Sequence, residues 1–215
     1  MSFLNQLRSQ ANALQSQQGQ LQANLEENTA QAEAACRSTL SYLEDLARHL
    51  NIIKPAGPKF SLDGRTPWPP MKLIDFRVDA RKRMLRNREV FDYLAMGWRV
   101  VPQVGAPLGG AVSVNFPPDL QRVEARLAMG PVKHERKEQR HPEKNTLQAI
   151  EFEYITETRG NVVVTPDHEK AMLAFRVLNA TGFEILNVSW PAARIITETL
   201  DDLAKLVVCE PNRFA

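Results

Sequence analysis

Residues 1–52 read MSFLNQLRSQANALQSQQGQLQANLEENTAQAEAACRSTLSYLEDLARHLNI and contain no proline, the residue that most readily breaks a helix. From Leu4 onward, mostly apolar residues recur at intervals of three and four, which is the heptad pattern of a coiled coil. The positions of this seam are Leu4, Leu7, Ala11, Leu14, Gln18, Leu21, Leu25, Asn28, Ala32, Ala35, Thr39, Tyr42 and Leu46. We therefore predict one uninterrupted helix whose apolar stripe is buried by another helix.

The length of this helix limits where it can pack. Residues 2–52 would span about 75 Å, much more than the width of a compact domain of this size. Packing entirely on its own sheet is the alternative, but strands are usually under ~20 Å long. Gly19 is the one plausible break point, and no turn-forming cluster surrounds it. A projecting helix that pairs with another chain is the expectation.

The flanks of the seam are nearly uncharged, although coiled coils usually select their partners through charges at these positions. Only Arg8 and Asp45 are charged there, so electrostatics neither forbids self-pairing nor dictates a partner. We predict a homo-oligomer first, and docking into another protein's helices second. The firmest contacts are expected between Leu25 and Ile53, where the stripe widens. The residues assigned to oligomerisation are Leu7, Leu14, Leu21, Leu25, Ala32, Ala35, Tyr42 and Leu46.

The composition is that of a folded protein with one ordinary domain and an appendage: 215 residues, 43% hydrophobic and 24% charged. A net charge of +2 is too small to imply a nucleic-acid or membrane partner by itself. No apolar run approaches the ~20 residues of a membrane span, and the N-terminus lacks the apolar core of a signal peptide. Cys36 and Cys209 form neither a disulfide framework nor a metal pattern. A cytoplasmic protein without a membrane partner is expected.

Residues 54–70 (KPAGPKFSLDGRTPWPP) contain five prolines and two glycines. Each proline fixes its own φ and keeps the preceding residue out of the helical region, so this segment is expected to be an extended linker. Phe60, Leu62 and Trp68 are expected to anchor it to the domain that follows.

From Met71 the pattern changes to a period of two, which indicates half-buried strands. Ile74, Phe76 and Val78 alternate with charged residues. Similar alternation occurs over residues 112–116, 123–129 and 150–154.

Two hairpins and a final helix complete the expected domain. Arg159-Gly160-Asn161 predicts a tight turn into residues 162–164, and residues 171–178 and 183–189 flank a second turn. Pro191 is expected in the first turn of a C-terminal helix that covers the sheet. The predicted fold class is α+β, with a long N-terminal coiled-coil helix, an antiparallel sheet domain and a C-terminal covering helix. The predicted organisation is helix 1–53, linker 54–70 and α+β domain 71–215.

Residues 79–96 (DARKRMLRNREVFDYLAM) have two interpretations. Helix propensity, with Asp79 as N-cap and Gly97 as stop, favours a helix. The alternation of apolar residues on either side of Arg86-Asn87-Arg88 instead fits two long strands joined by a turn. We expect the helix and leave the hairpin open.

A basic cluster lies in the same region, with Asp79 as its one acid. Arginine forks suit phosphate, so the cluster is a candidate contact for anions or nucleic acid. The alternative, a solvated basic face paired with the glutamates of the sheet, is favoured because the whole chain is near neutral. No aromatic residue is interleaved for base stacking. The six residues are Arg77, Arg81, Lys82, Arg83, Arg86 and Arg88.

No catalytic, cofactor-binding or metal-binding motif emerges. His134-Glu135 resembles the start of a zinc-protease helix, but Glu138 stands where the second histidine is required. Residues 133–144 fit a hydrated hairpin tip or loop better. Asp167-His168-Glu169 places an acid beside a histidine, but neighbouring side chains point apart, and a turn after Pro166 explains them.

These observations favour a non-enzymatic assembly or adaptor protein that oligomerises through its N-terminal helix and presents its α+β domain to a protein partner. A nucleic-acid-associated protein using residues 77–88 is the alternative. A small enzyme with a dispersed site gathering His168 or Asp92 is third, and no cofactor is expected.

Overall fold

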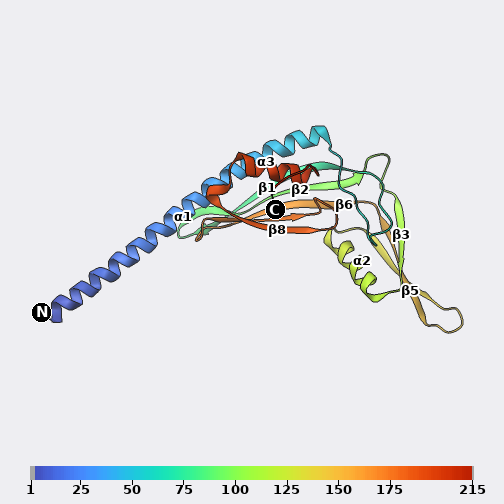
Figure 1. Cartoon of the computed structure of the whole chain (residues 1–215), viewed down its shortest axis with the longest axis horizontal. Helices are drawn as coiled ribbons and strands as arrows, with labels where there is room; N and C mark the ends of the chain where they lie inside the picture. The colour runs from blue at the N-terminus through green and yellow to red at the C-terminus, as the bar shows by residue number, and fades with distance from the viewer. Residues whose placement is uncertain (1–2, 215) are drawn as a thin grey trace.

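The structure is a computed structural model that describes residues 3–214. The chain forms two antiparallel sheets flanked by helices (Figure 1). The elements are α1 (Phe3–Ile53), β1 (Met71–Leu85), β2 (Arg88–Pro102), β3 (Gly109–Val114), α2 (Pro117–Met129), β4 (His134–Arg140), β5 (Leu147–Ile155), β6 (Thr158–Asp167), β7 (Met172–Leu178), β8 (Ile185–Pro191), the 3-10 turn η1 (Ala192–Arg194) and α3 (Thr197–Val207).

The larger sheet has five strands in the order β1-β2-β6-β7-β8, and the smaller has three in the order β3-β5-β4. Every pairing is antiparallel. The α+β class, with its long N-terminal helix and C-terminal helix, is therefore confirmed.

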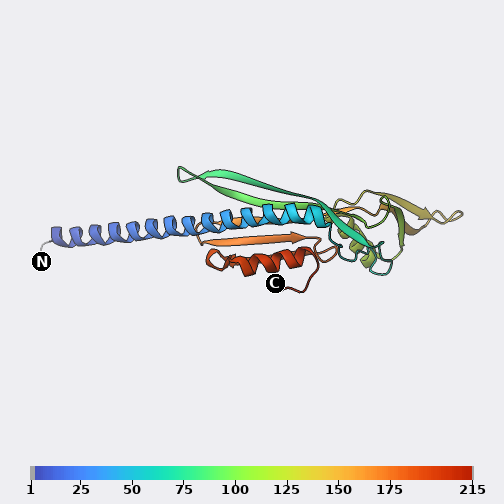
Figure 2. The same cartoon turned by 90° about the horizontal axis from the view of Figure 1, so that it is seen from above.

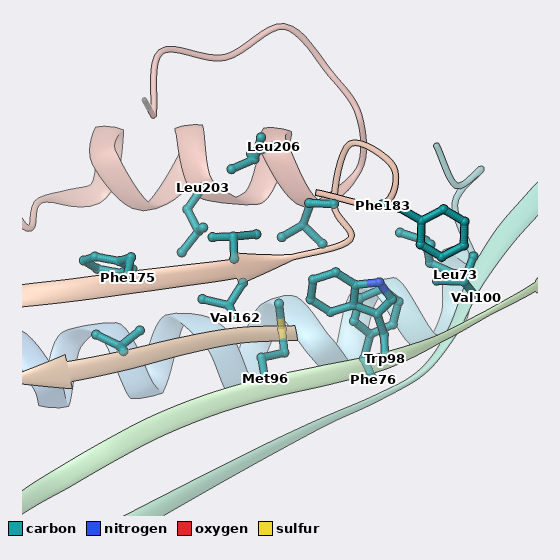
Figure 3. Close-up of a cluster of buried hydrophobic side chains, with 14 of the residues drawn as sticks. Leu73, Phe76, Met96, Trp98, Val100, Val162, Phe175, Phe183, Leu203 and Leu206 are labelled. Carbon is teal, nitrogen blue, oxygen red and sulfur yellow. The ribbon is translucent and has the colours of Figure 1, made fainter. Parts of the chain in front are cut away.

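Helices α1 and α3 lie side by side over one face of the five-stranded sheet (Figure 2). The core between them is built from alternate residues of the central strands, including Met96, Trp98, Val162 and Phe175, against Leu203 of α3 (Figure 3). None of the helices within residues 3–214 lies over the opposite face of this sheet, where side chains such as Arg159, Thr165 and Arg176 are exposed.

Helix α1 runs without interruption through Gly19, as predicted. It ends where Lys54 adopts a φ of +50° and Pro55 follows, since neither a left-handed residue nor a proline continues an α-helix. Its C-terminal half lies on the sheet, whereas its N-terminal end extends beyond every strand (Figures 1 and 2).

The helix predicted for residues 79–96 is wrong, because this segment forms the outer part of the β1–β2 hairpin. Arg86 and Asn87 have φ values of +49° and +61°, the pair of left-handed residues that a two-residue type I′ turn requires. The favourable helix propensity is overridden by the cross-strand hydrogen bonds and by burial of Phe91 and Leu94 against α1 and the core.

The strand predicted for residues 123–129 is also wrong. This segment belongs to α2, which starts with two prolines and buries Val123 and Leu127, four residues apart, while Ala125 is exposed. The four-residue spacing of Val123 and Leu127 resembles a strand pattern in the sequence, because the small residue Ala125 lies midway between them.

The predicted turn at Arg159-Gly160-Asn161 is wrong too, because β6 runs straight through it and pairs with β2. Strands β5 and β6 belong to different sheets, and the chain passes from one to the other at Thr156 and Glu157. Gly160 serves close packing instead: an added Cβ would lie 2.3 Å from Cε2 of Trp98.

The proline-rich segment 54–70 lies against the domain, and its expected anchors Phe60, Leu62 and Trp68 are all buried. Trp68 stacks on Tyr154 of the smaller sheet, with ring centroids 5.6 Å apart. Asp63 stabilises the bend between Ser61 and Pro67, because its carboxylate accepts hydrogen bonds from the backbone and hydroxyl of Thr66 and from the Arg65 backbone. Burial would raise the pKa of this carboxyl, but these hydrogen bonds lower it to about 2.

The hairpin predicted from residues 171–178 and 183–189 is confirmed as β7 and β8. The C-terminal helix begins later than expected, because Pro191 ends β8 and α3 starts at Thr197. Its apolar face is buried at Leu200, Leu203, Leu206 and Val207, so the helix covers the sheet as predicted.

Candidate assembly site on the N-terminal helix

Residues 3–24 of α1, which precede the part docked on the sheet, form what we call the free segment. Its large apolar side chains have no cover from the domain: Leu7 is 46% exposed, Leu14 60% and Leu21 57%. Phe3, at the start of the helix, is 73% exposed. The side chain of Leu4, the first position of the predicted seam, lies outside the described part of the chain. The free segment thus presents apolar surface that a partner can bury.

The three leucines are separated by seven residues each, which places them along one side of the helix with a drift of about 20° per heptad. Ala11 and Gln18 lie between them on the same side. Arg8 is the one charged side chain of the free segment. This surface is therefore apolar along a narrow stripe and neutral around it.

The rest of the predicted seam faces the protein's own domain. Ala32 and Ala35 are 0% and 6% exposed, and Tyr42 and Leu46 are partly buried against the core. The hydroxyl of Tyr42 also donates a hydrogen bond of 2.6 Å to Oδ1 of Asp201 in α3. Leu25, partly buried, lies at the boundary. The structure therefore divides the eight predicted oligomerisation residues: three are exposed, four face the domain and one lies between.

A buried polar contact fixes the position of α1 on the sheet. Oε1 of Glu33 lies 3.0 Å from Nε2 of His168 and accepts a hydrogen bond of 2.8 Å from the backbone N–H of Phe91. Glu33 is 9% exposed and His168 is 2% exposed. One carboxylate thus joins α1 to β2 and to the β6–β7 turn, and leaving either partner without it would cost the desolvation of a buried polar group.

Further contacts surround this carboxylate where α1 leaves the sheet. The Asn28 side-chain amide donates to the backbone carbonyl of Glu169, at 2.6 Å, and Arg86 at the hairpin tip forms an ion pair with the Glu169 carboxylate at 3.1 Å. A hollow of about 260 Å³ lies beside them, lined by residues that include Gln22, Glu26 and Arg88. These contacts therefore hold α1 in place at the point where the free segment leaves the domain.

The predicted seam does not include Glu33, and the acid next to His168 in the sequence is Asp167. The structure confirms a turn there, but His168 binds a carboxylate that is distant in sequence. An available signal was the position of Glu33 within the apolar stripe between Ala32 and Cys36. A carboxylate in such a place requires a buried partner.

Cys36 is completely buried beside Glu33. Burial, and secondly the charge of Glu33, raises the pKa of the Cys36 thiol to about 12, although Arg37 acts in the opposite direction. The thiol therefore remains protonated and unreactive at neutral pH.

The basic cluster lies on the β1–β2 hairpin, and four of its six members have carboxylate partners. Arg81 and Arg83 share Asp92, at 3.9 and 3.4 Å, and Lys82 pairs with Glu89 at 2.9 Å. Arg86 pairs with Glu169, as described above. Within residues 3–214, Arg77 and Arg88 are the two members with no carboxylate within 4.0 Å. Most of this charge is compensated locally, which reduces its capacity to bind phosphate.

The remaining sequence candidates do not converge on a chemical site. His134 lies on the exposed edge strand β4, far from His168 in the fold, and Asp92 is engaged by arginines. Across the described residues, no three His, Cys, Asp or Glu side chains are grouped as metal ligands. A cavity of about 650 Å³ lies on the smaller sheet, lined by residues that include Gly110, Glu153 and Tyr154.

Comparison with known proteins adds no family: no protein-family model, no curated protein and no solved structure matches the chain. Among the helices of residues 3–214, none has the length and apolar character needed to cross a membrane. The free segment of α1 is the surface on which the argument for function rests.

Proposed function

We propose that this protein is a non-enzymatic assembly protein in which the free segment pairs with the free segment of a second copy. One observation carries the proposal: Leu7, Leu14 and Leu21 are exposed at heptad spacing on a helix that extends beyond its own domain. A helix of this kind gains stability when a second helix covers its apolar stripe.

A second copy of the chain suits this surface better than a partner that is selected by charge. The free segment holds a single formal charge at Arg8, so two copies bring little like-charge repulsion in either orientation. A partner selected by charge would need complementary charges at the flanking positions, but in the free segment Arg8 is the one charge there. The other flanks are Gln10, Gln15, Gln17, Gln22 and Asn24. Packing of leucines then specifies the contact.

The strength of pairing follows from the area that remains to be buried. Each leucine is about half exposed, so covering it contributes about 1 kcal/mol. Summed over two short helices, this gain is comparable with the ~4–15 kcal/mol cost of association. Pairing is therefore expected to be reversible and dependent on concentration.

Weak pairing is sufficient for assembly when the domain binds its own partner. Joining two domains makes a second binding event intramolecular and raises avidity by ~10²–10⁴ without a new contact. The α+β domain would be presented in pairs to a protein partner. Two unpaired cysteines, Cys36 and Cys209, support a reducing compartment such as the cytoplasm as the place of action.

The test is light scattering on the full-length chain from about 1 μM to about 1 mM, the range in which weak association is measurable. The wild-type mass should rise with concentration. Combined Leu7→Glu, Leu14→Glu and Leu21→Glu substitutions should abolish the part of the rise that depends on the helix, because they place charges along the stripe.

The matched control carries the same three charges on the opposite side of the helix, as Ser9→Glu, Ser16→Glu and Ala23→Glu. All three positions are exposed. This variant should associate like wild type. A wild-type chain that stays monomeric over the whole range, or a control that loses association equally, would overturn the proposal.

A further inference from the structure

The larger sheet has two edge strands that differ in charge. Strand β1, at one edge, carries Arg77, Arg81 and Lys82 among other charged residues. Strand β8, at the other edge, has the sequence ILNVSWP with no charged residue. Charged side chains on an edge strand prevent pairing with another strand, and their absence leaves the edge open to it.

The hydrogen-bonding pattern identifies which backbone groups of β8 are free. At the two ends of the β7–β8 pair, Asn179 N–H donates to Glu184 O and Ala192 N–H donates to Ala171 O. Antiparallel partners exchange hydrogen bonds at every second residue, so the even-numbered residues of β8 bond to β7. The N–H groups of Ile185, Asn187 and Ser189 point away from the sheet.

The side chains of β8 leave apolar surface next to these groups. Leu186, Val188 and Trp190 point to the helix-covered side of the sheet but are only partly buried, unlike the corresponding residues of β7. Phe175, opposite Val188, is 1% exposed. The apolar layer therefore continues to the edge without being closed there.

The other uncharged edge, β3, lacks this feature. Its apolar side chains Val112 and Val114 are already buried, and the strand begins with Gly109 and Gly110, which weaken strand pairing. Strand β4, at the other edge of the smaller sheet, is charged along most of its length. Among the four edge strands of the two described sheets, β8 is the one that has free backbone groups, no charged residue and apolar side chains that are only partly buried.

We infer that β8 pairs antiparallel with β8 of a second copy, about a two-fold axis at Val188, to form one continuous sheet. This register is self-complementary: Val188 meets Val188, Leu186 meets Trp190, and Asn187 meets Ser189. The apolar residues share one face and the polar residues share the other. Pro191, which has no N–H, falls at the end of the pair opposite Ile185, where its missing donor costs least.

This inference goes beyond the proposed function, because it requires no contact made by α1. A chain with a pairing helix and a pairing sheet edge has two self-complementary surfaces. Two such surfaces on one chain build either a closed tetramer or an extended array, rather than a simple dimer.

The test is disulfide trapping in the full-length chain with Cys209→Ser, which leaves only buried Cys36. The two Val188 residues would form a non-hydrogen-bonded pair with Cα atoms about 4.5 Å apart, within disulfide range. Val188→Cys should therefore give a covalent dimer under mild oxidation. Asn187→Cys should not, because its symmetry mate is displaced by two residues, about 6.8 Å along the strand.

A second arm places charge on the edge. Asn187→Lys with Ser189→Lys should lower the yield of the Val188→Cys dimer at least tenfold, and Thr165→Lys, exposed two strands away, should leave it unchanged. The Leu7, Leu14 and Leu21 glutamate variant should still give the trapped dimer, even if the helix proposal fails. Absence of the dimer, or equal trapping by Asn187→Cys, would overturn the inference.

Discussion

The two halves of α1 share a sequence period but differ in what covers them. In residues 25–53 the buried positions are mostly small, including Ala32, Ala35 and Thr39. In residues 3–24 the stripe consists of leucines separated by seven residues, and it is exposed. One stripe therefore packs on the protein's own sheet in its second half and is exposed in its first half.

The difference in side-chain size has a physical reason. Small residues such as Ala32 and Ala35 let the helix backbone lie close to the side chains that rise from the sheet. Leucines need a surface with gaps between side chains, such as another helix provides. Periodicity alone does not distinguish these cases, because the docked half also buries leucines, at Leu43 and Leu50.

The largest expected difference between the halves is in thiol reactivity. In the full-length Cys209→Ser chain, Cys36 should react with a thiol reagent at least about a thousandfold more slowly than an introduced cysteine at Ser16→Cys. Burial and a pKa near 12 both protect Cys36, whereas Ser16 is exposed on the free segment. Labelling rates measured by mass spectrometry test this, and similar rates would show that the docked half detaches readily.

The next largest effect concerns the buried carboxylate. Glu33→Ala should lower the free energy of unfolding by about 3 kcal/mol, because it leaves His168 and the Phe91 N–H without their partner. Urea titration measures the change. Glu44→Ala, at an exposed position of the same helix, is the control and should change stability by less than about 0.5 kcal/mol. If both variants lose the same free energy of unfolding, Glu33 does not anchor α1 to the sheet.

The same substitution in each half should have opposite consequences. Ala32→Leu should destabilise the fold by about 1–3 kcal/mol, because the site is fully buried against the sheet. Ala11→Leu, on the exposed stripe, should leave unfolding unchanged and strengthen self-association. Urea titration and light scattering on both variants test the pair, and an Ala11→Leu chain that associates less than wild type would contradict the helix proposal.

The smallest effect is expected at Gly19. An added Cβ there meets no atom within 4 Å, so Gly19→Ala should favour the helix by about 1 kcal/mol. Because the free segment lies outside the core, this gain should appear in circular dichroism and as association up to about fivefold tighter, rather than in global unfolding. A weaker association would indicate that the partner helix packs directly on Gly19.

Local sequence was a reliable guide where one pattern had one structural meaning. The absence of proline before Pro55 predicted a single helix, and the turn residues after Leu178 predicted the β7–β8 hairpin. It failed at residues 79–96, where helix propensity and strand alternation coexist. Pairing with distant residues decided between them.

The candidate site could be predicted only in part from the sequence. The exposed leucines followed from heptad spacing, but the sequence has no marker for where the sheet ends beneath α1. That limit lies near Thr29, which is buried, whereas the preceding turns are exposed.

The sequence by itself determined the long helix, the antiparallel α+β class and the C-terminal cover, because these depend on chain-local propensity and periodicity. Only the tertiary structure decided that half of α1 packs on its own sheet, that Glu33 contacts His168, and that the uncharged strand β8 lies at an edge. The Glu33–His168 contact joins residues 135 positions apart, the docking of α1 depends on strands that form later in the chain, and the free edge depends on the order of the strands. Such contacts arise from the packing of the whole chain, which no local pattern encodes.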